Sequence, residues 1–375
     1  DSAELLLERL RIENYRNLVR EEISFSKGLS FLLGPNGAGK SSVLEAFYLV
    51  CTARSLSSGR LERCVQQGRA GFSLFAKIAA SADHHSVLAN KKKAKALKIY
   101  LDDKPIERNS DLVRIFPVQP ILPSAADLLL GPPSFRRSQL DWVLFHVEQD
   151  FLALAHQYKR ALKQRNSWLR SSLQAENGPD PWADALVTSG AAIEARRSAA
   201  VDVIEPIFSE IVRGVDERLD CAVTYKEGGM LKLDEGFASL ARRRSSDRLI
   251  GATVLGPQRA DLLFRNGLAP CSEVLSRGQV KTVSACWALA CSVFLGGKIG
   301  RQPAVLFDEI GADWDSSTLL NFISRAAQFG GQVVGTSSNW EYNGWEEVSK
   351  RHNAALFHVE QGKIRVRSDS AIQGA

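Results

Sequence analysis

The feature that most constrains this chain is a glycine-rich loop near its beginning, Gly34-Pro-Asn-Gly-Ala-Gly-Lys-Ser41. It follows residues 28–33, a compact apolar run of the kind that forms a strand buried on both faces. After the loop, the apolar residues between Val43 and Val50 have helical spacing. The loop matches the pattern GxxxxGK(S/T) at every fixed position, between the strand and the helix that this pattern requires.

This loop has the chemistry of a phosphate-binding site rather than of a plain glycine turn. Its glycines allow successive backbone N–H groups to turn inward on a phosphate chain, where a larger side chain would clash. Lys40 supplies a mobile cation for the β- and γ-phosphates, and the Ser41 hydroxyl is a Mg²⁺ ligand. We predict that ATP and Mg²⁺ bind here, the nucleotide through Gly34, Pro35, Asn36, Gly37, Ala38, Gly39, Lys40, Ser41 and Ser42.

A second motif, Ala304-Val-Leu-Phe-Asp-Glu-Ile310, is an apolar strand that ends in two adjacent acids. Ionised carboxylates are costly inside a sheet, so a pair at a strand's end needs a solvated or metal-bound role. Taken with the phosphate loop, the motif predicts that Asp308 holds Mg²⁺ through its water shell and that Glu309 orients the attacking water as the base. The predicted catalytic residues are therefore Lys40, Asp308 and Glu309, and the predicted metal ligands are Ser41 and Asp308.

A third motif, Leu275-Ser-Arg-Gly-Gln279, precedes a long apolar helix. Ser276 is a good N-cap, so an ordinary helix start is one interpretation. The sharper hypothesis is that the helix's positive end grips a γ-phosphate together with Ser276, Arg277, Gly278 and Gln279. Because one side of each nucleotide already faces its own loop and acidic pair, this element would serve a second subunit, and ATP would join a homodimer.

The middle of the chain has a different texture. From Leu140 to Tyr158 apolar residues recur in steps of four and three, which predicts a long helix continuing through Leu169. The segment Asn177-Gly-Pro-Asp-Pro181 ends it, and a second helical pattern runs from Trp182 to Val215. The two helices, of roughly 35 residues or about 50 Å each, would form an antiparallel pair. We therefore predict an N-terminal half of an ATPase domain over residues 1–134, an inserted helical domain over 135–220 and a C-terminal half over 221–375.

Composition and charge fit a soluble intracellular protein. Lys and Arg outnumber Asp and Glu by 48 to 42, a net charge of +6 that suits an anionic partner without proving one. The six cysteines have no metal-ligand spacing and are expected to be reduced thiols. The sequence begins without a signal-peptide pattern, and its longest apolar stretch, around Ala285 to Leu295, is short for a membrane span. We expect a cytoplasmic, nucleoid-associated location and no membrane partner.

The chain resembles the ATPase heads of ABC and SMC proteins. It has the phosphate loop, the LSRGQ segment and the acidic strand end in this order, and a helical insertion splits the series. More narrowly, the chain resembles the RecF recombination-mediator family from about Leu7 to Lys363. The segments that carry this resemblance are Asn14-Tyr-Arg-Asn-Leu18, Ser134-Phe-Arg-Arg-Ser-Gln-Leu-Asp-Trp142, Lys163-Gln-Arg-Asn166, Gly256-Pro-Gln-Arg-Ala-Asp-Leu262 and Leu275-Ser-Arg-Gly-Gln279.

The resemblance implies an α/β fold, an ABC/SMC-type P-loop ATPase head with an inserted long antiparallel helical pair. It implies an ATP-dependent homodimer that binds DNA at single-strand/double-strand junctions and a weak, DNA-dependent ATPase whose slow hydrolysis releases the dimer. It also implies a role in DNA replication, repair and the SOS response, in which the protein, with RecR and RecO, helps to load RecA at gaps.

The resemblance also places a dimer-interface loop at Asp313 and Asp315 and shows two departures from the family pattern. The family usually has His where this chain has Gln258, and its interface loop typically reads Ser-Glu-Leu-Asp where this chain has Ala312-Asp-Trp-Asp315. After Val334 comes Gly-Thr-Ser-Ser338, without a transporter-type histidine, so that Thr336 or Ser337 is a candidate for sensing the γ-phosphate.

Several basic residues are candidates for binding the DNA backbone without reading its sequence. Helical spacing places Lys159, Lys163 and Arg170 on one face, although a solvated face of a long helix is an equal alternative. Loop contacts are expected from Arg242-Arg-Arg244, whereas Arg136 and Arg137 would fix the insertion to the ATPase sheet or sense nucleotide. The full set of candidates in the helix and in one loop is Lys159, Arg160, Lys163, Arg165, Arg170, Lys91, Lys92 and Lys93.

Three other functional classes compete with a DNA-binding ATPase switch. A transport ATPase would fit the motif spacing, but the long helical insertion and the missing histidine count against it. An SMC-like structural protein would need hundreds of coiled-coil residues in place of this insertion. A binding module could use ATP only as an adhesive, and loss of slow turnover in Glu309→Gln would distinguish an enzyme from it.

Overall fold

The computed structural model describes residues 5–56, 60–80, 83–122, 124, 127–171, 179–339, 341–342 and 344–367. It divides into two compact units, and each unit is assembled from segments that are distant in the sequence. Unit 1 comprises residues 1–125, 214–217 and 277–375, and unit 2 comprises residues 126–213 and 218–276. The units differ from the predicted ranges 1–134, 135–220 and 221–375, because residues 218–276 group with the inserted helices. Those ranges stay a prediction about domain organisation.

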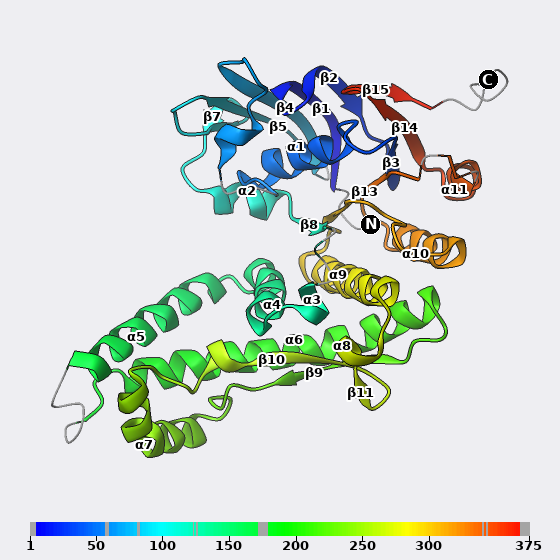
Figure 1. Ribbon diagram of the computed structural model, residues 1–375. Helices are drawn as coiled ribbons and strands as arrows, with labels where there is room; N and C mark the ends of the chain where they lie inside the picture. The colour runs from blue at the N-terminus through cyan, green and yellow to red at the C-terminus, as the bar shows by residue number, and fades with distance from the viewer. Residues whose placement is uncertain are drawn as a thin grey trace. The chain divides into compact units, whose positions relative to one another are not determined.

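The central sheet of unit 1 has six strands in the order β15-β14-β3-β13-β12-β8. All neighbours pair in parallel except β15, which closes an antiparallel hairpin with β14. Blue β3 therefore lies between orange β13 and red β14, strands from the far end of the chain (Figure 1). Because the strands are parallel, their carboxyl ends meet at one edge. Their bounds are β3 Leu29–Leu33, β8 Val118–Ile121, β12 Ala304–Phe307, β13 Val333–Ser337, β14 Ala355–Glu360 and β15 Lys363–Val366.

A second sheet of unit 1 is antiparallel throughout, in the order β2-β1-β4-β5-β6-β7. Its long strands alternate buried residues with partly or fully exposed ones, as expected of a sheet with one face on the core. The strands are β1 Leu5–Tyr15, β2 Leu18–Ser24, β4 Gly71–Ala80, β5 Asp83–Lys92, β6 Lys98–Leu101 and β7 Lys104–Pro105.

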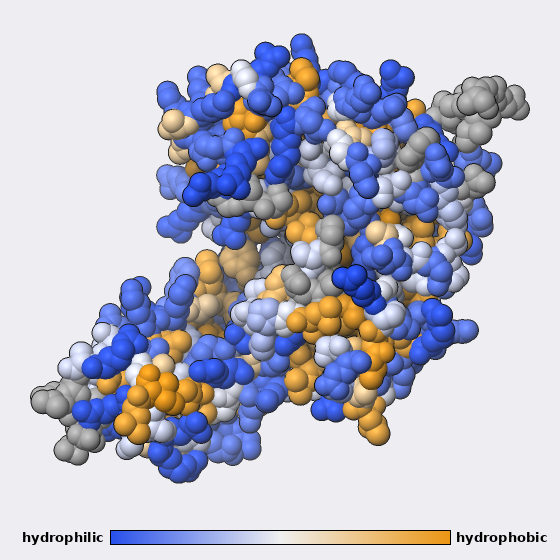
Figure 2. Space-filling model, viewed as in Figure 1, coloured by the Kyte–Doolittle hydropathy of each residue, from blue (hydrophilic) through white to orange (hydrophobic). Residues whose placement is uncertain are grey.

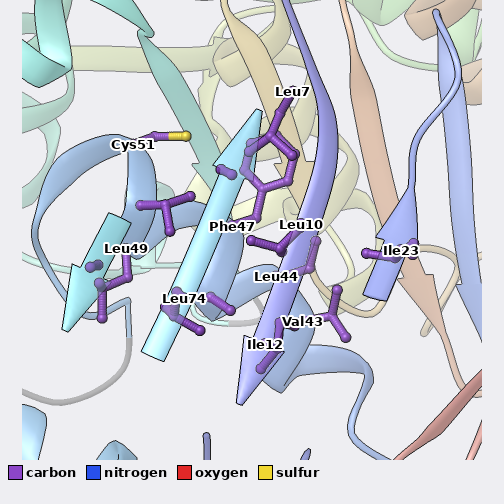
Figure 3. Packing of buried hydrophobic residues seen from close by; sticks show 14 of the residues in the cluster. Leu7, Leu10, Ile12, Ile23, Val43, Leu44, Phe47, Leu49, Cys51 and Leu74 are labelled. Carbon is purple, nitrogen blue, oxygen red and sulfur yellow. The ribbon is translucent and has the colours of Figure 1, made fainter. Parts of the chain in front are cut away.

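Helix α1 (Lys40–Thr52) fills the space between the two sheets of unit 1. It contacts β1, β4 and β5 of the antiparallel sheet and β8 and β13 of the parallel sheet. Leu44 and Phe47 of this helix lie beside Leu10 and Ile12 of β1 in the shared core (Figure 3). A helix that is apolar nearly all round belongs inside a core. The phosphate loop at its beginning is thus attached to the most buried helix of this unit's core.

The remaining helices of unit 1 cover its sheets. They are α2 Asn109–Ile115, α9 Arg277–Ile299, α10 Ser316–Gln328 and α11 Gly344–His352. Among the described residues α9 alone is long and apolar enough to cross a membrane, and 78% of its most apolar window is buried inside the protein. That degree of burial is typical of a core helix, whose apolar surface is covered by its own protein.

Unit 2 combines helices with the small antiparallel sheet β11-β10-β9. The predicted single helix from Leu140 through Leu169 is wrong, because residues 148–150 interrupt it. Glu148 has an extended backbone, and Arg196 of α6 binds the carboxylates of Glu148 and Asp150. The helices are α3 Asp127–Leu130, α4 Pro133–Val147, α5 Phe151–Ser171, α6 Ala183–Val215, α7 Leu233–Ile250 and α8 Cys271–Val274, and the strands are β9 Cys221–Lys226, β10 Asp261–Asn266 and β11 Ala269–Pro270.

The predicted antiparallel arrangement of the two inserted helices is confirmed for α5 and α6. Asp150, just before α5, pairs with Arg196, and further along α5 the Tyr158 ring is 3.1 Å from the position that a Cβ on Gly190 would take. The partner residues run backward along α6 as α5 runs forward. Of the predicted breaker between them, Asn177 and Gly178 lie outside the described residues.

Candidate functional site

The phosphate loop connects β3 to α1 and needs glycine at three of its positions. Gly37 and Gly39 have φ angles of 77° and 117°, in the left-handed region that favours glycine. A Cβ on Gly34 would lie 2.0 Å from the carbonyl oxygen of Val359 on β14. Backbone conformation and close packing, rather than flexibility, therefore explain the three glycines of the motif.

Lys40, the first residue of α1, is buried and turned back over the loop. Its ammonium donates hydrogen bonds to the carbonyl oxygens of Gly34 and Pro35, both at 2.9 Å. The same Nζ atom is 3.6 Å from Oε1 of Glu309 at the end of β12. The predicted phosphate-binding cation and the predicted base thus lie at the same edge of the parallel sheet.

The two predicted metal ligands are in direct contact. Ser41 Oγ donates to Asp308 Oδ1 at 2.9 Å, and Thr336 Oγ1 on β13 donates to the same oxygen at 2.7 Å. Hydroxyl and carboxylate oxygens are the ligands that Mg²⁺ prefers, usually one or two from the protein with the rest from phosphates and water. The described residues contain no cluster of three or more His, Cys, Asp or Glu suited to a metal. The pair therefore fits a Mg²⁺ ion that is held jointly with a nucleotide.

Glu309 is fixed in both backbone and side chain. Its φ angle of 57° lies in the left-handed region, which is uncommon for a residue other than glycine, and its N–H donates to Thr336 Oγ1 at 2.8 Å. Its carboxylate oxygen Oε2 accepts hydrogen bonds from the Ser338 hydroxyl at 2.9 Å and the Ser338 N–H at 3.3 Å. Such local strain, held by surrounding bonds, is typical of functional positions.

The loop is braced by residues of the Asn14–Leu18 segment. Asn17 donates from its side chain to the Gly37 carbonyl at 3.2 Å and accepts from the Ser42 hydroxyl at 2.9 Å. Arg16 forms a two-point ion pair with the buried Glu45 of α1, with its Nη2 2.9 Å from Oε1. This pairing raises the pKa of the Arg16 guanidinium above its ordinary value. The family-like segment therefore acts as a support for the phosphate loop.

The LSRGQ segment forms the start of α9, as its cap pattern predicts. Helix α9 begins at Arg277, so Ser276 stands immediately before it, and both side chains are exposed. Gly278 and Gln279 are half-buried. A Cβ on Gly278 would lie 2.5 Å from the Asp313 carbonyl oxygen, so this glycine allows close packing of the helix on the loop after β12.

Two side chains connect α9 to the loop that follows β12. Lys281 donates from Nζ to the carbonyl oxygens of Glu309 and Ala312, at 3.0 and 3.1 Å. The indole N–H of Trp314 donates to the Gly278 carbonyl at 3.3 Å. Burial lowers the pKa of Lys281, opposed by the nearby carboxylates of the same loop. The beginning of α9 and the loop that carries Glu309 are thus one hydrogen-bonded assembly.

The predicted dimer-interface residues Asp313 and Asp315 are both exposed. Asp313 has a left-handed φ of 69°. Asp315 caps α10, because its carboxylate accepts the Thr318 N–H at 2.7 Å. Asp315 therefore has a structural role in the fold, and its role at an interface stays a prediction.

Of the predictions for DNA-binding residues of α5, the one for Arg165 is wrong. Lys159, Arg160, Lys163 and Arg170 are exposed, and Arg170 donates to the Gly251 carbonyl at 2.9 Å. Arg165 is completely buried, with its guanidinium bound to the Asp180 and Asp247 carboxylates and the Thr253 hydroxyl, each at 2.7 Å. A buried arginine that is bound to two carboxylates within the protein cannot bind a phosphate backbone.

For the cluster Lys91–Lys93, the prediction that Lys91 contacts DNA is also wrong. It is 3% exposed, and its ammonium forms an ion pair with Glu62 at 2.6 Å. Lys92 and Lys93 are exposed. Lys91 and Lys92 also end strand β5 rather than lying in a loop, and Arg242–Arg244 lie within helix α7 rather than in a loop.

The contacts within unit 2 show the surroundings of Arg136, Arg137 and Gln258. Arg136 binds both carboxylate oxygens of Asp261, at 2.7 and 3.0 Å, and Arg137 donates to the Ala260 carbonyl at 2.8 Å. They fix α4 to β10, a strand of the predicted C-terminal half, and a role in sensing nucleotide stays a prediction. Gln258, the departure from the family's histidine, accepts a hydrogen bond from the Tyr158 hydroxyl of α5 and donates to the Leu255 carbonyl at 2.9 Å.

Sequence reasoning missed several residues of this site. Asn17 and Lys281 carry no pattern of their own, and the only signal for Asn17 was its place in the Asn14–Leu18 segment. Thr336 was a candidate for sensing phosphate, but it bonds Asp308, and Ser338 rather than Ser337 holds Glu309. The short polar run at the end of β13 was the signal that could have found both.

Comparison with known proteins agrees with this arrangement. Residues 6–343 match the family model described as RecF/RecN/SMC N terminal domain. "DNA replication and repair protein RecF" of Pseudoalteromonas atlantica is 30% identical over 366 residues, 96% of this chain and 99% of that protein. The protein of the same name from Pseudomonas syringae pv. syringae is 32% identical over 366 residues, 97% of this chain and 99% of that protein.

Solved structures share the fold. The structure of the recombination mediator protein RecF-ATP in the RecFOR pathway superimposes with a TM-score of 0.80 at 18% identity, over 98% of this chain and 99% of that one. An SmcHead bound to the C-winged helix domain of ScpA has a TM-score of 0.58 at 14% identity, covering 98% of each chain. The predicted fold, an ABC/SMC-type ATPase head, is confirmed, and the chain belongs to the RecF family of DNA replication and repair proteins.

Proposed function

We propose that this protein is an ATP-switched DNA-binding protein of recombinational repair. The observation that carries the proposal is the meeting of Lys40, Ser41, Asp308 and Glu309 at the carboxyl edge of one parallel sheet. Open α/β sheets bind their ligands at this edge. The relatives named for DNA replication and repair supply the biological context.

Each residue has a defined task toward ATP and Mg²⁺. The loop N–H groups and Lys40 bind the β- and γ-phosphates, and Ser41 with Asp308 holds the metal ion. When bound, Mg²⁺ neutralises developing charge on the phosphates. Glu309, oriented by the two hydrogen bonds from Ser338, positions the attacking water and accepts its proton. With Glu309 held in place, positioning and electrostatic stabilisation can support slow hydrolysis.

The exposed beginning of α9 supports a nucleotide-bridged homodimer. Ser276 and Arg277 are accessible to a second molecule, and the end of a 23-residue helix contributes a partial positive charge. In this dimer Ser276–Gln279 of each subunit contact the γ-phosphate held by the other. Asp313 and Asp315 lie in the loop that packs on α9 and contribute to the same interface.

The DNA partner binds through the exposed basic face of α5, formed by Lys159, Arg160 and Lys163. A sequence-independent backbone contact suits recognition of single-strand/double-strand junctions, and DNA stimulates the weak ATPase by favouring the dimer. RecR and RecO act with the protein in the cytoplasm, at the nucleoid, to promote RecA loading at gaps.

Sedimentation velocity with ATP, Mg²⁺ and gapped DNA tests the dimer and its switch. The wild-type protein should dimerise only with nucleotide, and Glu309→Gln should hydrolyse no ATP while its dimer persists. Ser276→Arg should bind ATP with nearly normal affinity and stay monomeric, because the motif acts across the interface. Ser272→Arg, an exposed position on α8, is the matched control and should dimerise normally. Normal dimers in Ser276→Arg would refute the shared nucleotide, and unchanged turnover in Glu309→Gln would refute the base.

A further inference from the structure

Unit 1 contains a cavity of about 680 Å³ on the antiparallel sheet, and residues 34–42 of the nucleotide loop are not part of its lining. Its walls come from the turn before β4, from β4 and β5 where they pair, and from the turn between β5 and β6. Hydrophilic residues cover much of the surface over this part of the unit in Figure 2. The volume is within the range of pockets that hold small ligands.

The cavity is strongly cationic. Arg69, Lys92, Lys95 and Lys98 line it with exposed side chains, and its lining includes no acidic residue. Within the described residues, none of these four cations lies within ion-pair distance of a carboxylate. Unneutralised cations that converge on a recess attract polyanions, because the local field is not cancelled by neighbouring acids.

The fifth cation of the lining, Lys91, has the different task of holding the wall in place. Its buried ammonium donates to the carbonyl oxygens of Lys92, at 3.0 Å, and of Lys95, while Glu62 balances its charge. A Cβ on Gly71 would lie 2.2 Å from the Lys91 carbonyl oxygen, so glycine permits the close pairing of β4 and β5 there. The turn that presents Lys92 and Lys95 is therefore preformed.

The rest of the lining suits a nucleobase. Tyr100 of β6 contributes a half-buried aromatic ring, and Asn14, Asn90 and Ser73 contribute uncharged donors and acceptors. Proteins that bind single-stranded nucleic acid combine a basic groove with aromatic side chains on which bases stack. A paired base is not available for stacking on a side chain in a recess, whereas an unpaired one is.

We propose that this cavity binds an unpaired strand of DNA, with phosphates on Arg69, Lys92, Lys95 and Lys98 and a base against Tyr100. The proposal rests on the DNA-binding function proposed above and deepens it, since α5 would bind the duplex and this cavity the single strand. A junction is then recognised because it alone offers both forms of DNA to one molecule.

Fluorescence anisotropy with labelled single-stranded, blunt duplex and gapped DNA tests the assignment. Lys95→Glu with Lys98→Glu should weaken single-strand and gapped-DNA binding about tenfold or more and reduce the slope of log K against log salt by about 1.4, for two lost phosphate contacts. Blunt-duplex affinity should change less than twofold. The matched control reverses Lys77 and Lys104, which are exposed on the same sheet outside the cavity, and should keep single-strand binding within about twofold after correction for net charge.

A second pair of variants tests the aromatic contact. Tyr100→Ser should weaken single-strand binding by about tenfold, the usual effect of losing one stacked base, whereas Tyr100→Phe should retain it. An excess of dAMP should not displace the strand, which separates a DNA site from a mononucleotide site.

The outcomes separate this proposal from the function on which it rests. Wild-type protein that binds no DNA would overturn both. Wild-type protein that binds DNA, with unchanged affinity and salt slope in Lys95→Glu with Lys98→Glu, would overturn the cavity alone. Equal losses on single-stranded and blunt duplex DNA would overturn the unpaired strand as its ligand, and displacement by dAMP would replace it with a free nucleotide.

Discussion

Substituting Arg165 by Met should destabilise unit 2 strongly, because it leaves buried carboxylates without their cation. Arg165 and Asp247 have no exposed side-chain surface, and Asp180 has only 11%. Removing one partner of a buried ion pair typically costs about 3–5 kcal/mol, since the remaining charge is desolvated and uncompensated. The methionine keeps much of the side chain's volume, so the loss reports charge rather than a cavity.

Urea unfolding followed by tryptophan fluorescence measures this loss, since Trp168 and Trp182 lie in the same unit. With a slope of about 2 kcal/mol per molar urea, the midpoint should fall by about 2 M. Combining Arg165→Met with Asp247→Asn should recover a substantial part of the loss, because the amide removes the orphan charge and keeps an acceptor for the Val254 N–H.

Lys163→Met is the matched control on the same helix. Lys163 is exposed, so its loss should change the midpoint by less than about 0.3 M while lowering affinity for duplex DNA and reducing the salt slope by about 0.9. An Arg165→Met protein with wild-type stability and weakened DNA binding would refute the reasoning and restore Arg165 as a DNA contact.

Three further predictions concern the assembly of α9 with the loop after β12. Lys281→Met should reduce the turnover number of ATP hydrolysis about tenfold or more with little change in ATP affinity, because the carbonyls of Glu309 and Ala312 lose their donor and the base is displaced. Steady-state kinetics measures the turnover number and isothermal titration measures the affinity. Equal effects on the two quantities would contradict the prediction. Gly278→Ala should lower the melting temperature of unit 1 and weaken dimerisation of the protein, because the new methyl group would lie 2.5 Å from the Asp313 carbonyl oxygen. A variant with wild-type melting and dimer formation would disprove this. Asp315→Ala should cost about 1 kcal/mol in urea unfolding through the lost cap of α10, whereas Asp315→Asn should retain most of it; equal losses in the two variants would exclude capping as the cause.

Local sequence patterns predicted the parts of the fold in which a functional motif lies at the end of a strand or the beginning of a helix. The strand–loop–helix of residues 28–50 and the acidic end of β12 were legible because each motif needs its residues at fixed spacing. Strand β8 was missed because Pro120 argues against a strand, and the structure tolerates it because β8 is an edge strand. Strand β5 was missed because its polar and basic residues lack clean alternation.

Contacts between distant residues could not be predicted in the same way. The apolar spacing from Leu140 to Tyr158 continues unchanged across the break between α4 and α5, so periodicity does not reveal it. Arg165 is close to Lys163 in sequence, and its burial depends on Asp247, 82 positions later. The same holds for Lys91, whose partner Glu62 lies on a short 3₁₀ turn.

The order of strands in the parallel sheet has a consequence for how the protein is made. The phosphate loop follows β3, whose two neighbours β13 and β14 are both translated after residue 330, and the Ala38 carbonyl accepts a hydrogen bond from the Gly362 N–H at 2.8 Å. The first fifty residues therefore emerge from the ribosome long before their supports exist. A nascent chain therefore cannot complete the surroundings of its phosphate loop before β13, β14 and the turn that carries Gly362 have been synthesised.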